Sequence, residues 1–72
     1  MEKKNLYFNI YIENELEHDI ELVGFADDMK ALSKYFEKNK STLYALGIKK
    51  IKGLRLNIEY NNKKYLIIVD SE

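Results

Sequence analysis

Two stretches in the last third of the chain alternate apolar and polar residues and are separated by a pair of asparagines. The first covers residues 54–60 and the second covers residues 63–70. Alternation with a period of two is typical of β-strands that bury one face. Asparagine tolerates the left-handed backbone conformation that a two-residue type I′ turn requires. We therefore predict a β-hairpin with its turn at Asn61-Asn62. Its register pairs Leu54 with Val69, Leu56 with Ile67 and Ile58 with Tyr65.

The second strand of this hairpin is apolar on both faces. Tyr65, Ile67 and Val69 alternate with Leu66 and Ile68. A strand of this kind is usually central in its sheet and needs cover on both sides. We therefore expect it to lie inside the sheet, with Leu66 and Ile68 on the face opposite the main core.

A similar alternation near the start of the chain predicts a second hairpin. Residues 6–12 alternate strictly, and the alternation resumes at Leu16 after the polar residues 13–15. A three-residue loop places apolar side chains opposite one another, whereas a two-residue loop would oppose apolar and charged ones. The favoured register pairs Ile12 with Leu16, Ile10 with His18, Phe8 with Ile20 and Leu6 with Leu22. Gly24 is expected to end the second strand.

Between the hairpins, four apolar residues follow one another at helical spacing. They are Phe25, Met29, Leu32 and Phe36. We predict one helix that is capped by Asp27 or Asp28 and ends near Asn39. A short turn from Ser41 to Gly47 follows, and residues 48–53 are interpreted as an irregular edge strand.

These elements predict an α+β fold in a single small domain over residues 1–72. The expected order is β-β-α-(β)-β-β, an antiparallel four- to five-stranded sheet with one helix packed on one face. The face of the sheet opposite this helix is called the outer face below.

Residues that could carry catalysis are few and scattered. The chain has no cysteine and one histidine, so thiol catalysis, disulfides and cysteine metal ligation are excluded. His18 has no recognisable serine partner, and the three glycines form no phosphate-binding loop. The carboxylates match no calcium-loop spacing. We therefore expect no enzymatic activity, no cofactor and no metal site.

Composition also bears on the source and the location of the protein. Lys, Asn, Ile and Tyr supply 32 of the 72 residues. These amino acids have AT-rich codons, which indicates a low-GC bacterium or one of its phages. No apolar run approaches the roughly 20 residues that span a membrane. The expected location is the cytoplasm of a bacterial host cell, with no membrane partner.

Twelve basic and twelve acidic residues cancel in the total charge, but the two signs occupy different parts of the chain. From residue 13 to residue 28 every Asp, Glu, Lys or Arg is acidic. From residue 30 to residue 64 there are ten basic residues and two acidic ones. The acids of the first part are Glu13, Glu15, Glu17, Asp19, Glu21, Asp27 and Asp28.

The acidic half suggests a protein-binding surface. The predicted register places two tyrosines beside three carboxylates on the outer face. Aromatic anchors surrounded by charge are typical of protein-binding patches. The leading hypothesis is a non-enzymatic module that docks on a basic surface of a larger protein, such as a nucleic-acid-binding protein or complex. Its predicted contact residues are Tyr7, Tyr11, Glu17, Asp19 and Glu21. A homodimer through the outer face and a purely solvating role for the acids are the alternatives.

The basic half suggests a small nucleic-acid-binding domain instead. The candidate residues are Lys30, Lys34 and Lys38 on the helix, followed by Lys49, Lys50, Lys52 and Arg55. Only one of them is arginine, the residue best suited to bidentate contacts with phosphate or guanine. The helical lysines also lie opposite the apolar stripe, where solvated residues are expected in any case. Direct nucleic-acid binding is therefore the less favoured hypothesis.

In size, AT-rich composition, lack of catalytic groups and charged sheet face, the chain is similar to the small inhibitors that phages make against host defence nucleases, anti-CRISPR proteins among them. This resemblance implies an inhibitor of a host nuclease or defence complex. It rests on general character and on no shared motif, so it implies no site residues.

Overall fold

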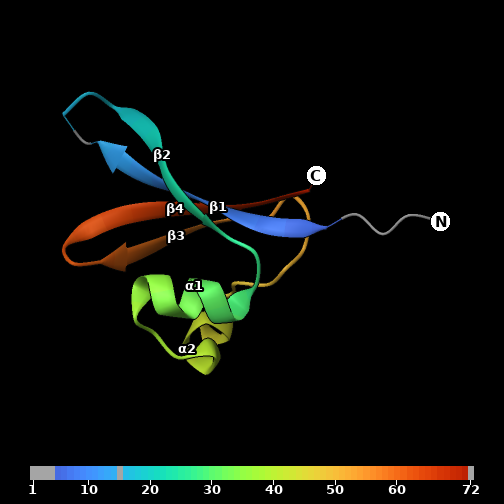
Figure 1. Cartoon of the computed structure of the whole chain (residues 1–72). Helices are drawn as coiled ribbons and strands as arrows, with labels where there is room; N and C mark the ends of the chain where they lie inside the picture. Colours follow the sequence, from blue (N-terminus) through green and yellow to red (C-terminus); the bar gives the residue numbers. More distant parts are fainter. Residues whose placement is uncertain (1–4, 15, 72) are drawn as a thin grey trace.

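The computed structural model describes residues 5–14 and 16–71 (Figure 1). Its strands are β1 (Leu6–Asn14), β2 (Asp19–Ala26), β3 (Arg55–Tyr60) and β4 (Lys63–Ser71). Two helices, α1 (Met29–Phe36) and α2 (Lys40–Ala45), lie between β2 and β3 in the chain. The strands form one antiparallel sheet in the order β2-β1-β4-β3. Both helices lie on one side of it (Figure 1).

The β3–β4 hairpin confirms the sequence prediction. Ile58 pairs with Tyr65 and Leu56 pairs with Ile67. Asn61 and Asn62 have φ angles of 53° and 63°, the left-handed values that a type I′ turn needs. β4 lies between β1 and β3, as its apolar residues on both faces predict.

The core lies between the sheet and the two helices. Burial of apolar side chains here is the main source of stability in a chain this small. Phe36 is fully buried and meets the rings of Tyr60 and Tyr65 edge-on, at centroid distances of 5.7 and 5.3 Å. The buried residues are Phe8, Ile10, Ala26, Met29, Leu32, Phe36, Leu43, Ile48, Ile58, Ile67 and Val69.

The structure has two helices in this layer where one was predicted. Asp28 caps α1, since its Oδ1 accepts a hydrogen bond of 2.8 Å from the backbone N–H of Ala31. Glu37, with φ of 51°, adopts a left-handed conformation that ends α1 before the predicted Asn39. The chain then turns into α2, which directs the buried Leu43 into the core.

The predicted edge strand at residues 48–53 is not confirmed. Ile48 is fully buried, and its backbone N–H donates to the carbonyl of Leu43, which continues the compact turn after α2. The chain meets β4 at Gly53, whose N–H donates to the carbonyl of Val69. Residues 48–53 therefore bury Ile48 in the core and do not form the predicted edge strand.

The β1–β2 hairpin forms, but its predicted register is wrong. Ile12 pairs with Glu21 and Asn14 pairs with Asp19, so the loop is longer than three residues. A β-bulge also shifts the register between Ile10 and Tyr11. The predicted pairs of Ile12 with Leu16, Ile10 with His18, Phe8 with Ile20 and Leu6 with Leu22 are therefore not formed.

Gly24 and Phe25 belong to the interior of β2, contrary to prediction. Gly24 lies opposite Ile10 at the bulge and does not end the strand. A Cβ atom at Gly24 would lie 3.1 Å from Cε2 of Tyr35, so α1 approaches the backbone of β2 closely at this point. Phe25 is 69% exposed on the other side of β2 and takes no part in the apolar stripe of α1.

Neither helix in residues 5–14 and 16–71 has the length and apolar character that a membrane span requires.

Candidate functional site

The outer face of the sheet carries side chains from all four strands. Residues that pair directly across neighbouring strands point to the same face. Tyr11 lies between Leu22 of β2 and Leu66 of β4, and Asn9 lies between Phe25 and Ile68. Leu66 and Ile68 therefore emerge on the outer face, as predicted.

The apolar residues of the outer face are contiguous and unusually exposed. Phe25, Leu22 and Ile20 on β2 are 69%, 56% and 43% exposed. Tyr7, Tyr11, Leu66 and Ile68 on the central strands are half-buried. Single exposed apolar residues are common, whereas a continuous patch is typical of an interaction surface.

The three carboxylates predicted beside the tyrosines do not lie on the outer face. Glu21 is opposite Ile12 and Asp19 is opposite Asn14, so both point to the side of the sheet that carries the helices. Glu17 lies in the loop between the strands. Only Tyr7 and Tyr11 keep their predicted positions. The predicted patch is divided because a register change by an odd number of residues exchanges the two faces of a strand.

The acids gather instead on the distal part of the β1–β2 hairpin, here called the hairpin arm (residues 13, 14 and 16–22). Among the described pairings, β1 meets β4 only up to Ile12, opposite Tyr65. Beyond that point the hairpin projects away from β3 and β4 (Figure 1). The exposed acids of the arm are Glu13, Glu17, Asp19 and Glu21. Glu15 lies outside the described residues.

The loop of the arm is organised by Asn14. Its Oδ1 accepts hydrogen bonds of 3.1 and 3.4 Å from the backbone N–H groups of Leu16 and Glu17. This local turn presents Leu16 to solvent with 94% of its side chain exposed. His18 completes the turn with a φ of 54°. The arm thus carries exposed aliphatic and acidic side chains together.

Two open grooves are lined mainly by residues of the arm. The larger, of about 400 Å³, is lined by Ile12, Glu13, Asn14, Leu16, Glu21 and Lys63. The other, of about 350 Å³, is lined by Asn14, Glu17, Asp19, Ile20 and Glu21. Both combine carboxylates with an aliphatic side chain, which suits contact with a basic and partly apolar partner.

The predicted basic residues do not form one surface. Lys30 and Lys34 are exposed on α1, and Lys38 follows the helix half-buried. Lys49, Lys50 and Lys52 lie in the connection from α2 to β3. Arg55 pairs with Ile68 and therefore belongs to the outer face, on the other side of the sheet from α1.

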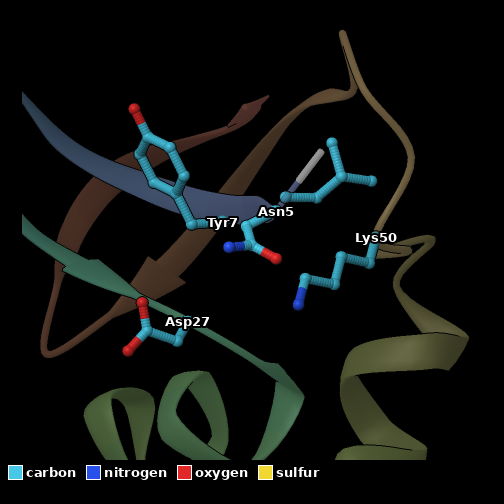
Figure 2. Close-up of a pocket in the computed structure, with 5 residues that line it drawn as sticks. Asn5, Tyr7, Asp27 and Lys50 are labelled. Carbon is cyan, nitrogen blue, oxygen red and sulfur yellow. The ribbon is translucent and has the colours of Figure 1, made fainter. Parts of the chain in front are cut away.

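A small polar hollow lies beside the start of β1 (Figure 2). Its volume is about 240 Å³, and Asn5, Leu6, Tyr7, Asp27 and Lys50 line it. Ligand pockets are usually larger, roughly 300–1,000 Å³, and mostly apolar. The hollow therefore does not identify a small-molecule site.

Two of the hydroxyl groups have structural partners. Ser33 donates a hydrogen bond to the carbonyl of Lys38, and Tyr60 donates one to the carboxylate of Glu37. That bond raises the pKa of Tyr60, with smaller increases from desolvation and from the charge of Glu37. In the part of the chain that the structure describes, no three His, Asp or Glu side chains converge as metal ligands.

Sequence reasoning missed Ile20, Leu22 and Phe25 as outer-face residues. The alternation of apolar and polar residues stops at Leu22, because Val23 and Phe25 are also apolar, so periodicity alone does not assign the faces beyond it. A glycine inside a strand pattern was the one available signal, because glycine there often marks a bulge.

Comparisons of this chain with protein-family models, with curated proteins and with solved structures found no match.

Proposed function

We propose that this protein is a non-enzymatic protein-binding module that docks its hairpin arm on a basic surface of a larger protein. The observation that carries the proposal is the joint exposure of acids and aliphatics on one projecting hairpin. The acids are Glu13, Glu17, Asp19 and Glu21, and the aliphatics are Leu16, Ile20 and Leu22.

The two kinds of side chain have different roles in such a contact. Carboxylates steer the encounter with a basic partner and discriminate against acidic ones. Desolvation of Leu16 and Ile20 supplies affinity that does not depend on salt. The proposal keeps the acidic half as the binding surface, with its carboxylates on the arm and not beside Tyr7 and Tyr11.

The favoured partner is a protein that binds nucleic acid. Exposed carboxylates on a projecting hairpin present negative charge, as a phosphate backbone does, and suit a basic groove made for one. In this proposal the protein works in the cytoplasm of a bacterial host as a phage-type inhibitor of a nuclease or defence complex, similar in style to anti-CRISPR proteins.

The test compares capture of partners by three immobilised forms of the protein. They are the wild type, the arm variant E17K/E21K and the control variant D27K/E59K, which has the same net charge as the arm variant. Asp27 and Glu59 are exposed acids outside the arm. The bait is incubated with nuclease-treated bacterial lysate at low and high salt, and mass spectrometry identifies the captured proteins.

The expected result is a protein that the wild type and the control variant both capture and the arm variant loses. Its capture weakens at high salt because exposed charges are screened. Equal capture by a correctly folded arm variant contradicts the proposal. Retention of the protein on a DNA or RNA resin, lost in K30Q/K34Q/K38Q, replaces it with the nucleic-acid-binding alternative.

A further inference from the structure

We propose that a second copy of this chain docks on the outer face, so that the protein forms a two-fold symmetric dimer of face-to-face sheets. The dimer axis lies in the interface and runs perpendicular to the strands. This inference shares Glu13, Ile20 and Leu22 with the hairpin arm, but its ion pair, Lys64 with Asp70, lies outside the arm. It does not depend on the function proposed above.

Strand pairing arranges the outer face in four rows across the sheet. The row nearest the arm contains Glu13 of β1, opposite Ile20, and Lys64 of β4, opposite Glu59. The two middle rows are mainly apolar. The second row runs Leu22, Tyr11, Leu66, Asn57, and the third runs Phe25, Asn9, Ile68, Arg55.

The fourth row is at the opposite end of the sheet from the arm. There Tyr7 of β1 pairs with Asp70 of β4. The basic Lys64 and the acidic Asp70 therefore lie on the same strand and the same face, with Leu66 and Ile68 between them. This order makes β4 self-complementary in charge, with Glu13 and Glu59 on either side of Lys64 in the first row.

A two-fold axis between the middle rows superimposes the second row of one copy on the third row of the other. Leu66 then meets Ile68 of the second copy, and Leu22 meets its Phe25. At both ends of the interface, Lys64 meets Asp70 of the second copy. Apolar side chains thus face each other on β2 and β4, while Tyr11 meets Asn9 and Asn57 meets Arg55 of the second copy. An ion pair of opposite orientation lies at each end.

An axis parallel to the strands gives a poorer match. It would place Leu22 over Asn57 of the second copy and Ile20 over Glu59. Both arrangements bury apolar surface, but this one leaves exposed aliphatics against polar side chains. The perpendicular axis is therefore the one we propose.

The size of the face is compatible with a reversible dimer. Four strands about 4.8 Å apart and about eight residues long at about 3.4 Å each make a face of the order of 500 Å². Two such faces bury roughly 1,000 Å², which is below the range of stable specific interfaces and within that of weak, transient ones. The dimer is therefore expected to dissociate when the protein is diluted.

Sedimentation velocity over a range of protein concentrations tests the proposal. The variants are K64E, D70K and the double variant K64E/D70K. A further variant, L22E, places a carboxylate against Phe25 of the second copy and should also weaken the dimer. Each single charge reversal brings like charges together at both ends and should weaken the dimer by about tenfold or more. The double variant restores opposite charges across the interface and should dimerise nearly as the wild type does.

Recovery in the double variant distinguishes the interface from damage to the fold. Both single substitutions are still present in that chain, so any cost to the monomer is still present as well. Urea denaturation of each variant measures that cost separately. A wild type that stays monomeric at all concentrations, or a double variant that fails to recover, overturns the proposal. The arm variant E17K/E21K should dimerise normally, which keeps this test separate from that of the arm.

Discussion

The hydroxyl of Tyr60 donates a hydrogen bond to the carboxylate of Glu37, and this contact joins the end of β3 to the residue that ends α1. Glu37 is held in a left-handed conformation that reverses the chain there. The ring of Tyr60 meets Phe36 edge-on at the same place. The helix layer and the sheet are therefore connected at this corner by both polar and aromatic contacts.

This contact predicts that the free energy of unfolding decreases at alkaline pH. The bond to Glu37 raises the pKa of Tyr60 above its ordinary value of 10.0. The stabilisation is complete below the unfolded pKa of about 10 and is lost as the pH rises through the folded pKa. We expect the free energy of unfolding to fall more steeply above pH ~10 in the wild type than in Tyr60→Phe. Urea denaturation at a series of pH values measures both curves, and parallel curves contradict the prediction.

The turn of the β3–β4 hairpin predicts opposite effects for two substitutions at one position. Asn62 has a φ of 63°, which glycine adopts without a steric penalty and β-branched residues do not. Asn62→Gly should stabilise the protein by about 0.5 kcal/mol. Asn62→Val should destabilise it by about 1–2 kcal/mol. Denaturation midpoints that move in the same direction for both would exclude the type I′ turn.

The start of α1 predicts different roles for two adjacent aspartates. Asp28 accepts the capping hydrogen bond from Ala31, and Asp27 is exposed beside it. Asp28→Ala should cost about 1 kcal/mol of stability. Asp27→Ala removes the same charge without the cap and should cost much less. Comparable losses in thermal denaturation would show that charge near the helix end matters more than the hydrogen bond.

Truncation of Leu32, a core residue of α1, is expected to unfold the protein. Leu32 is fully buried between the helix and the sheet. Leu32→Ala should cost about 2–5 kcal/mol, which is comparable with the total stability of a domain this small. Circular dichroism should show a largely unfolded variant at room temperature. Lys34→Ala, an exposed change on the same helix, should remain folded.

The C-terminal half of the sheet was predictable because its signals are local. A two-residue Asn-Asn turn permits only one register, and both flanking strands alternate in agreement with it. β4 is apolar on both faces, which indicated its central place. Met29, Leu32 and Phe36 have the spacing of a buried helical stripe, and all three are buried.

The register of the N-terminal hairpin and the end of α1 could not be predicted from the alternation of apolar and polar residues. The register of Asp19 and Glu21 against β1 differs from the predicted one by an odd number of residues, which exchanges their faces. A bulge of one residue at Val23 changes the register again before Gly24. α1 ends at Glu37, which adopts a left-handed conformation. Glycine usually marks such a position in a sequence, and here it is absent. Tyr7 and Tyr11 of the candidate site were therefore placed on the correct face, and Asp19 and Glu21 were placed on the wrong one.

The order of the strands has a consequence for synthesis of the chain. The central pair of the sheet joins β1, the first strand, to β4, the last of the four. Closing so long a loop is entropically costly, so this pairing forms only with the support of the rest of the core. During synthesis, the β1–β2 hairpin with its exposed aliphatic residues therefore lacks its neighbour until β4 has been made. Completion of the sheet is thus expected to be a late step of folding that follows the synthesis of β4.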